Sequence, residues 1–148
     1  MRIIGGALGG RRLPVAKHFR SRATTDTAKE ALFNILSRQV DISTLAVLDL
    51  FAGTGNISYE FASRGARLVH SVEHNRRNVQ FIRETARMLG INTLEAFPFD
   101  ALKFIQKATQ AYDLVFADPP FDAPFLEQLP DRLLGSPALK SGGVLIIE

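Results

Sequence analysis

The chain has 148 residues, with no cysteine, three histidines and a formal net charge of +3 at pH 7. This length suits one domain with a single hydrophobic core. The lack of cysteine excludes disulfides, thiolate nucleophiles and cysteine metal sites, as expected in a reducing cytoplasm. The histidines do not pair at metal-ligand spacing, so we expect no metal. No apolar run approaches the roughly 20 residues that span a bilayer, and the N-terminus lacks the apolar core of a signal peptide, so we expect a cytoplasmic protein without membrane contact.

Residues 1–24 are predicted to form a basic hairpin and link ahead of a domain over residues 25–148. The stretches RIIGG and GGRRLPV are short apolar segments around glycines, a pattern typical of a β-hairpin or small flap. The residues that follow, His18 to Thr24, are predicted to be an irregular, exposed link. His18, and His70 further along the chain, are expected to be structural or solvated.

Charge is unevenly distributed along the chain. Residues 1–40 carry eight Lys and Arg against two acidic residues, a balance of +6, whereas residues 41–148 carry ten against thirteen, or −3. This asymmetry is expected if the first forty residues meet a polyanion. A solvated basic surface is the alternative, and charge alone favours neither.

A helix is predicted to begin at Thr25. Thr25 and Asp26 suit the N-cap, and Thr27 with Glu30 have the spacing of a capping box. One face of this helix is expected to be an apolar stripe made of Ala28, Ala31, Leu32, Ile35 and Leu36. We expect this helix to cover the domain that follows.

From residue 45 onward, segments of strand length alternate with helical segments. The predicted strands are LAVLDL (45–50), RLVHSVE (67–73), TLEAFPF (93–99), YDLVFA (112–117) and GGVLIIE (142–148). The predicted helices lie near 56–64, 75–89, 100–109 and 124–134. This alternation predicts an open, Rossmann-like α/β sheet, mostly parallel, with right-handed crossovers and helices on both faces. In such sheets ligands bind beyond the carboxyl ends of the strands.

The chain ends at Glu148, directly after the fifth predicted strand. Sheets of this type usually continue, and an apolar VLIIE strand at an edge is prone to pairing unless something covers it. We therefore expect a truncated form that lacks C-terminal strands.

The stretch VLDLFAGTGNIS, residues 47–58, predicts a strand, a glycine-rich turn and a helix. Gly53 and Gly55 let the backbone turn sharply and approach a ligand closely. The dinucleotide fingerprint GxGxxG is the main competitor, but Ser58 replaces its third glycine and the carboxylate of Asp49 would repel a pyrophosphate. A cofactor with a cationic, amino-acid-like end, such as S-adenosylmethionine, suits this turn better. A turn without any ligand is the remaining alternative.

Two further acidic residues end the second and third predicted strands. Glu73 is placed to accept hydrogen bonds from ribose hydroxyls, with His74 at the edge of an adenine ring. Capping of the following helix is the alternative for Glu73. Asp100 could accept from an adenine amino group beside Phe99 and Ala101, but taken alone it is more simply the N-cap of the next helix.

The stretch VFADPPFDAP, residues 115–124, places an acid, two prolines and an aromatic ring at the end of the fourth predicted strand. Pro119 and Pro120 fix φ and remove two backbone donors, which stiffens the turn. Asp118 and the Pro119 carbonyl then offer two acceptors beside the stacking face of Phe121. Two acceptors match an exocyclic NH₂ group, whose lone pair they could aim at a methyl carbon without a metal or a covalent intermediate. A strand terminator with a surface phenylalanine is the alternative.

The motifs DLFAGTG, VE and DPPF together resemble class I S-adenosylmethionine-dependent methyltransferases that methylate amino groups, whose signature is (D/N)PP(F/Y/W). The stretches RIIGGALGGRRL and RATTDTAKEALFNIL are similar to the bacterial 16S ribosomal RNA guanine-N2 methyltransferases of the RsmD type. The resemblance covers nearly the whole chain. Ala23, Thr27 and Lys29 depart from the family pattern where RNA contacts are expected, and Asn56 departs from it in the cofactor turn.

The resemblance implies a role for each motif. The residues implied to bind S-adenosylmethionine are Asp49, Phe51, Ala52, Gly53, Thr54, Gly55, Glu73, His74, Asp100 and Ala101. Those implied to hold the target base are Asp118, Pro119, Pro120 and Phe121. Those implied to contact RNA are Arg11, Arg12, Lys17, Arg20, Arg22 and Thr25.

The implied reaction is methyl transfer to N2 of a guanine in 16S ribosomal RNA, guanine 966, by a monomer that acts on free RNA or on a 30S particle. Methylation of adenine N6 or of a protein glutamine is the alternative within the enzyme class, because the DPPF signature allows all three. A non-catalytic RNA-binding assembly factor is the alternative outside it. An intact Asp118 and glycine turn argue against a pure binder, which needs neither.

Overall fold

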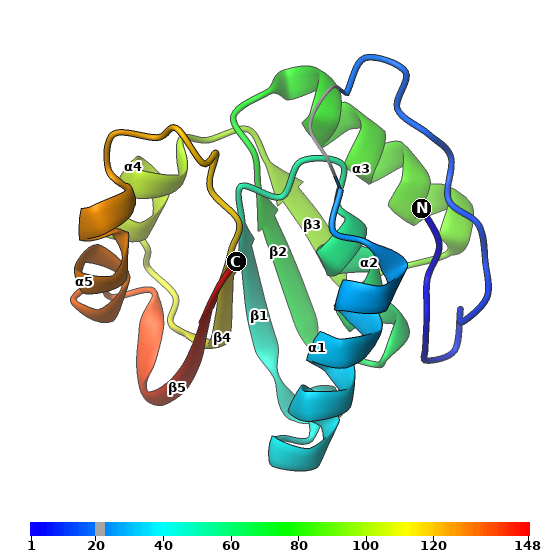
Figure 1. Cartoon of the computed structure of the whole chain (residues 1–148), viewed down its shortest axis with the longest axis horizontal. Helices are drawn as coiled ribbons and strands as arrows, with labels where there is room; N and C mark the ends of the chain where they lie inside the picture. The colour runs from blue at the N-terminus through cyan, green and yellow to red at the C-terminus, as the bar shows by residue number, and fades with distance from the viewer. Residues whose placement is uncertain (20–22) are drawn as a thin grey trace.

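The computed structural model describes residues 1–19 and 23–148 (Figure 1). In this part of the chain the strands are β1 (Ala46–Leu50), β2 (Leu68–Val72), β3 (Leu94–Phe97), β4 (Tyr112–Ala117) and β5 (Leu139–Ile147). The α-helices are α1 (Asp26–Gln39), α2 (Asn56–Ser63), α3 (Arg76–Leu89), α4 (Ala101–Gln106) and α5 (Leu129–Leu134), with short 3₁₀ helices η1 (Ile42–Thr44) and η2 (Leu126–Gln128). All strand pairs are parallel, in the order β3-β2-β1-β4-β5. The predicted Rossmann-like α/β fold is confirmed.

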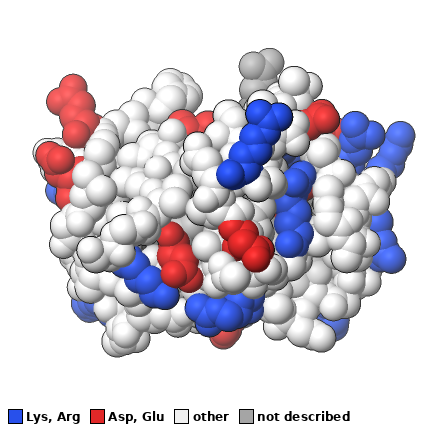
Figure 2. Space-filling model, turned by 90° about the horizontal axis from the view of Figure 1, so that it is seen from below, with Lys and Arg blue, Asp and Glu red and all other residues white. Residues whose placement is uncertain are grey.

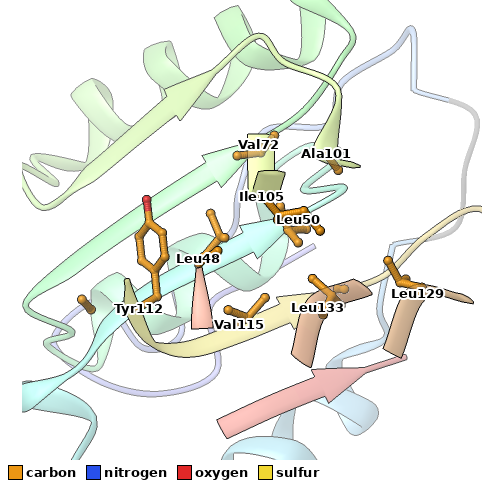
Figure 3. Packing of buried hydrophobic residues seen from close by; sticks show 12 residues of the cluster. Leu48, Leu50, Val72, Ala101, Ile105, Tyr112, Val115, Leu129 and Leu133 are labelled. Carbon is orange, nitrogen blue, oxygen red and sulfur yellow. The ribbon is translucent and has the colours of Figure 1, made fainter. Parts of the chain in front are cut away.

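The central strand β1 is buried along its whole length. Leu48 and Leu50 face α4 and α5, where they pack with Ile105 and Leu133 (Figure 3). Val47 points to the opposite face and joins the cluster formed by α1 and α2. Each such side chain stabilises the fold by about 1.5–3 kcal/mol relative to exposure. Because successive side chains of the strands point to opposite faces of the sheet, the fold has three layers, with α4 and α5 on one face and α1, α2 and α3 on the other.

The strand order changes direction beside β1. The chain runs outward from β1 through β2 to β3 and then returns to place β4 on the other side of β1. Leu50 pairs with Val72 on one side and with Ala117 on the other. The connections that leave β1 and β4 therefore diverge, which leaves a crevice at their carboxyl ends where ligands bind in sheets of this kind.

The N-terminal hairpin packs onto the domain. One antiparallel bridge joins Arg2 to Arg12, and the N–H of Ile3 donates to the Arg11 carbonyl at 2.9 Å. Ile3 and Leu13 are buried in a cluster with side chains of α2 and α3. The hairpin thus forms an outer cover on the α3 side of the sheet (Figure 1).

The buried face of α1 differs from the predicted stripe. Thr25 caps the helix by accepting from the N–H of Ala28 at 3.2 Å, as expected. The helix buries Lys29, Phe33 and Leu36, however, while Ala28, Ala31 and Ile35 are exposed. The sequence contains two overlapping stripes at helical spacing, and the one that contains a lysine is the one that packs. Lys29 is accommodated there because buried polar groups on α2 bind it.

No α-helix in residues 1–19 or 23–148 combines the length and the apolar character needed to cross a membrane.

Candidate active site

A cavity of about 840 Å³ opens at the carboxyl ends of β1, β2 and β4. Its walls come from the turn after β1, from residues 73–75, from residues 118–122 and from the link on both sides of residues 20–22. The volume lies in the range of small-molecule and cofactor sites. The cavity also occupies the crevice where the strand order changes.

The glycine-rich turn after β1 forms the floor of one half of this cavity. Gly53 and Gly55 have φ of +56° and +83°, a left-handed backbone that side chains rarely allow. A Cβ at Gly55 would also lie only 2.9 Å from the Tyr59 ring. Phe51 has φ of +60° and stacks on Phe125 with ring centroids 5.8 Å apart, which supports the strained backbone there. The two glycines therefore allow a tight left-handed turn that packs against Phe19 at Gly53 and against Tyr59 at Gly55.

Asp49 is an acid with almost no access to solvent, 2 % exposed. It accepts a hydrogen bond of 2.5 Å from the Ser58 hydroxyl, which lies 2.6 Å from the Ser71 hydroxyl. Burial raises the pKa of Asp49 to about 7; the Ser58 bond lowers it, and the charge of Asp118 raises it further. Ser58 stands where the dinucleotide fingerprint has its third glycine. Its hydroxyl binds Asp49, the acid whose charge would repel a pyrophosphate.

Glu73 connects the glycine turn to the start of α3. Its carboxylate accepts from the N–H of Gly53 at 2.9 Å and from the N–H of Asn75 at 2.8 Å. The His74 ring nitrogen lies 3.2 Å away. Both interpretations of Glu73 therefore have a structural basis, since it lines the cavity and also binds the N-cap residue of α3.

Asp118 lies across the cavity from the turn, at the end of β4. It is half-buried, and burial followed by the charge of Glu148 raises its pKa to about 6. Pro119 is buried beneath the turn, whereas the Phe121 side chain is 93 % exposed. The structure thus brings the two predicted halves, the glycine turn with its acids and the DPPF turn, into one cavity.

Three of the residues implied to bind the cofactor do not line the cavity. Asp100 is exposed and caps α4 by accepting from the N–H of Lys103 at 2.9 Å. Ala101 is buried in the hydrophobic cluster under α4 and α5. Gly55 lies behind the lining residues as the N-cap of α2. Contact of Asp100 and Ala101 with an adenine stays a prediction.

Several residues that line the cavity were not predicted to do so from the sequence. His18, expected to be structural or solvated, lines the cavity, as do Phe19 and Thr24. Asn56, read as a departure in the cofactor turn, donates to the Thr24 carbonyl at 2.9 Å and accepts from Lys29. The link has no periodic pattern, so nothing in the sequence indicates which of its side chains turn inward.

The residues implied to contact RNA are exposed where the structure describes them. Arg11, Arg12, Lys17 and Thr25 are all at the surface, whereas Arg20 and Arg22 lie outside the described residues. Lys29 is fully buried, and its ammonium group donates to the Arg2 carbonyl, the Asn56 side-chain oxygen and the Glu60 carboxylate. The ammonium group of Lys29, noted above as a departure from the family pattern, is therefore an internal structural element.

Within residues 1–19 and 23–148, no group of three or more His, Asp and Glu side chains is arranged to hold a metal ion. The face seen from below in Figure 2 carries Lys and Arg side chains interspersed with Asp and Glu. That face lies at the amino ends of the strands, away from the cavity (Figure 1).

Comparison with known proteins agrees with this geometry. The family described as "Conserved hypothetical protein 95" matches residues 1–148. Ribosomal RNA small subunit methyltransferase D of Escherichia coli K12 is 32 % identical over 148 residues, which cover 100 % of this chain and 74 % of that protein. Its counterpart in Haemophilus influenzae is 32 % identical over 152 residues, covering 100 % and 78 %.

The solved structure of a candidate methyltransferase, yhhF of Escherichia coli, superposes with a TM-score of 0.87 at 30 % identity. The match covers 99 % of this chain and 78 % of that one. Family model, curated relatives and structure thus agree over the whole chain. The chain belongs to the family of ribosomal RNA small subunit methyltransferase D, the RsmD family, and has its Rossmann-like methyltransferase fold.

Proposed function

We propose that the protein transfers a methyl group from S-adenosylmethionine to the N2 amino group of a guanine in 16S ribosomal RNA, guanine 966. The observation that carries this proposal is the single cavity that contains Asp49, Glu73 and the glycine turn on one side and Asp118 to Phe121 on the other. The names of the curated relatives support ribosomal RNA of the small subunit as the substrate.

The residues of the glycine-turn half fit the proposed cofactor. S-adenosylmethionine supplies an activated methyl group on a sulfonium centre and carries an ammonium group but no phosphate. The Asp49 carboxyl provides a buried negative charge for a cationic ligand, and the left-handed turn at Gly53 lets the backbone approach it. Glu73 would accept from the ribose hydroxyls, with Asp100 and Ala101 toward the adenine.

The DPPF half fits a flat base with an exocyclic amino group. The Asp118 carboxylate and the Pro119 carbonyl would accept its two N–H bonds and thereby aim the nitrogen lone pair at the methyl carbon. Asp118 can then accept the proton that the nitrogen loses once the new C–N bond has formed, because its pKa of about 6 is near neutrality. The exposed Phe121 ring would stack on the base.

The base has to leave its stack to reach this cavity. Exposed cations of the hairpin and link, Arg11, Arg12 and Lys17, would hold the flanking phosphates. The acceptor pair alone also suits adenine N6 or a glutamine amide. The choice of guanine is supported instead by the N-terminal hairpin and by the family membership.

The test is to incubate the protein with labelled S-adenosylmethionine and naked 16S RNA, 30S particles, DNA or protein, and to identify the modified residue. We expect N2-methylguanine in the RNA or the particles. Label in N6-methyladenine or in protein would contradict the guanine assignment, and a protein that binds no cofactor would contradict the enzymatic proposal altogether.

A variant tests the role of Asp118. Asp118→Ala is expected to lower the transfer rate by about 100-fold or more, since the amino group loses its orientation, while cofactor affinity stays nearly unchanged. Asp131→Asn, at an exposed position on α5, is the matched control and should retain the full rate. Parallel loss of transfer and of cofactor binding in Asp118→Ala would mean that Asp118 is structural.

A further inference from the structure

Two side chains of the link, His18 and Phe19, cover the glycine-turn half of the cavity. The Phe19 ring lies directly against Gly53: its Cζ is 2.9 Å from the point that a Cβ on Gly53 would occupy. The Phe19 N–H donates to the Ala16 carbonyl at 2.9 Å, and Ala16 is itself buried. The backbone at Phe19 is therefore held by a local turn that is anchored at the buried Ala16.

The neighbouring His18 joins the link to α3. Its Nε2 lies 2.9 Å from Oδ1 of Asn78, a residue in the first turn of α3 that is only 5 % exposed. Asn78 follows Glu73 and His74, which line the same cavity. The end of the link before residue 20 thus lies beside the start of α3 (Figure 1). His18 and Phe19 together reach from α3 to the glycine turn.

We propose that His18 and Phe19 form a roof over the methyl-donor half of the cavity. The tip of the Phe19 ring touches the turn at Gly53, and bound S-adenosylmethionine lies beside the face of the ring, next to Glu73. The inference rests on the proposed function, and it adds binding residues in a segment that is otherwise expected only to contact RNA. An aromatic ring against the turn excludes water from the cofactor and offers a favourable face to a cationic centre.

The roof has a chemical purpose in this site. Asp49 has to attract a cation while it is almost inaccessible to water, and a covered cavity strengthens that attraction because the local dielectric is low. A ring packed over the cofactor would slow its release. The dissociation rate of the cofactor is therefore the quantity that the roof controls most directly.

The experiment measures cofactor binding by itself, without methyl transfer. Isothermal titration gives Kd for S-adenosylmethionine, and stopped-flow displacement gives its dissociation rate. Phe19→Ala is expected to raise Kd about tenfold, mainly through faster dissociation, which corresponds to about 1.4 kcal/mol. Phe19→Tyr, which keeps the ring, should stay near wild type, and His18→Ala should raise Kd by a smaller factor. Thermal unfolding of each variant checks that the fold is intact.

Val15→Ala is the matched control, because Val15 belongs to the same segment, is 77 % exposed and does not line the cavity. It should leave both constants unchanged. An unchanged Kd in Phe19→Ala would overturn the roof while leaving the proposed function intact. Tighter binding in Phe19→Ala would also overturn it, since the ring would then occupy the space of the cofactor. A wild-type protein that binds no cofactor would overturn the proposed function, and the roof with it.

Discussion

Two carboxyl groups share the cavity but have different surroundings. Asp49 is enclosed by the sheet and by two serines, and its pKa is about 7. Asp118 is half-open, and its pKa is about 6. The charge of Asp118 is one of the causes that raise the pKa of Asp49. Without a cation between them, the two groups therefore resist being ionised together.

Binding of the methyl donor is expected to depend on pH through Asp49. Its pKa in the folded protein is raised from 3.8 to about 7, so below pH 7 a proton must leave before the carboxylate can attract a cation. Affinity should therefore rise by up to about tenfold per pH unit as pH approaches 7, and level off above it. Titration calorimetry in buffers of different ionisation enthalpy measures the released proton. Asp49→Asn should bind weakly with little pH dependence, and equal wild-type affinity at pH 6 and pH 8 would contradict the prediction.

The rate of methyl transfer is expected to depend on pH through Asp118. Its ionised form accepts the amino protons, so the rate at saturating cofactor should rise with pH and reach a plateau above about pH 6. Glu148→Gln removes a negative charge that raises the pKa of Asp118, which should move the rising part of the profile to lower pH. Single-turnover assays between pH 5 and 8 measure this shift, and a profile that does not move would mean that another group controls it.

At the scale of elements, a buried polar cluster joins the N-terminal hairpin to α1 and α2. Glu60 of α2 is fully buried and accepts from the N–H groups of Ile4 and Gly5, each at 2.8 Å, and from Arg64 at 2.9 Å. Lys29 of α1 lies 3.5 Å from the same carboxylate. Burial lowers the pKa of Lys29, and the charge of Glu60 opposes this effect. The cluster holds three segments together at one acid.

Removal of that acid is expected to be severely destabilising. Glu60→Ala leaves the buried Lys29 ammonium without its counter-charge and removes the acceptor of the partly buried N–H groups of Ile4 and Gly5, a change that should cost about 3–5 kcal/mol. Equilibrium urea unfolding measures the loss of unfolding free energy. Glu84→Ala, at an exposed position on α3, is the control and should change it by less than about 0.5 kcal/mol. A small effect at Glu60 would mean that water replaces the missing acceptor.

The elements themselves were predictable, but the orientation of α1 was not. Strands such as 46–50 and 112–117 are short apolar runs, because in a parallel sheet both faces of a strand are covered. In α1 the packed face contains a lysine, and hydrophobic periodicity counts that residue as polar. Only the position of Glu60, 31 residues away in the chain, shows why Lys29 is buried. This contact joins residues that are distant in the sequence, so no local sequence pattern predicts it.

At the scale of the whole molecule, the basic surplus of the first forty residues is smaller at the surface than in the sequence. Lys29 is internal, and Arg2 pairs with Asp26 at 2.9 Å. In the described part of the chain, Arg11, Arg12 and Lys17 form no ion pair. Among the described residues of the hairpin and link, these are therefore the cations best placed to bind phosphates.

The double variant Arg11→Gln, Arg12→Gln should weaken RNA binding and its salt dependence together. If each arginine neutralises one phosphate of a single-stranded segment, the slope of log K against log salt should become shallower by about 1.4. Fluorescence anisotropy with a 16S RNA fragment at several salt concentrations measures this slope. Arg38→Gln removes one positive charge at the far end of α1, away from the hairpin, and should have little effect. An unchanged slope in the double variant would exclude the hairpin from the interface.

The residues of the candidate site that lie at the ends of strands could be predicted from the sequence. Asp49, Glu73 and Asp118 follow or end neighbouring parallel strands, and the carboxyl ends of such strands meet at one edge of the sheet. His18 and Phe19 reach the same cavity from an irregular link, whose path depends on contacts with α3 and the glycine turn. Their position follows from the folded structure and not from a spacing in the sequence.

The place of the cavity between β1 and β4 also determines when it forms during folding. Contacts between these strands are distant in the chain; the bond from the Ala46 N–H to Asp113, for example, spans 67 positions. Closing so long a loop is slow, so the pairing of β1 with β4 is expected to be a late step of folding. The acids of the two halves therefore meet only when β1 and β4 have paired. A ligand that needs both halves should slow unfolding of the finished protein without accelerating its refolding.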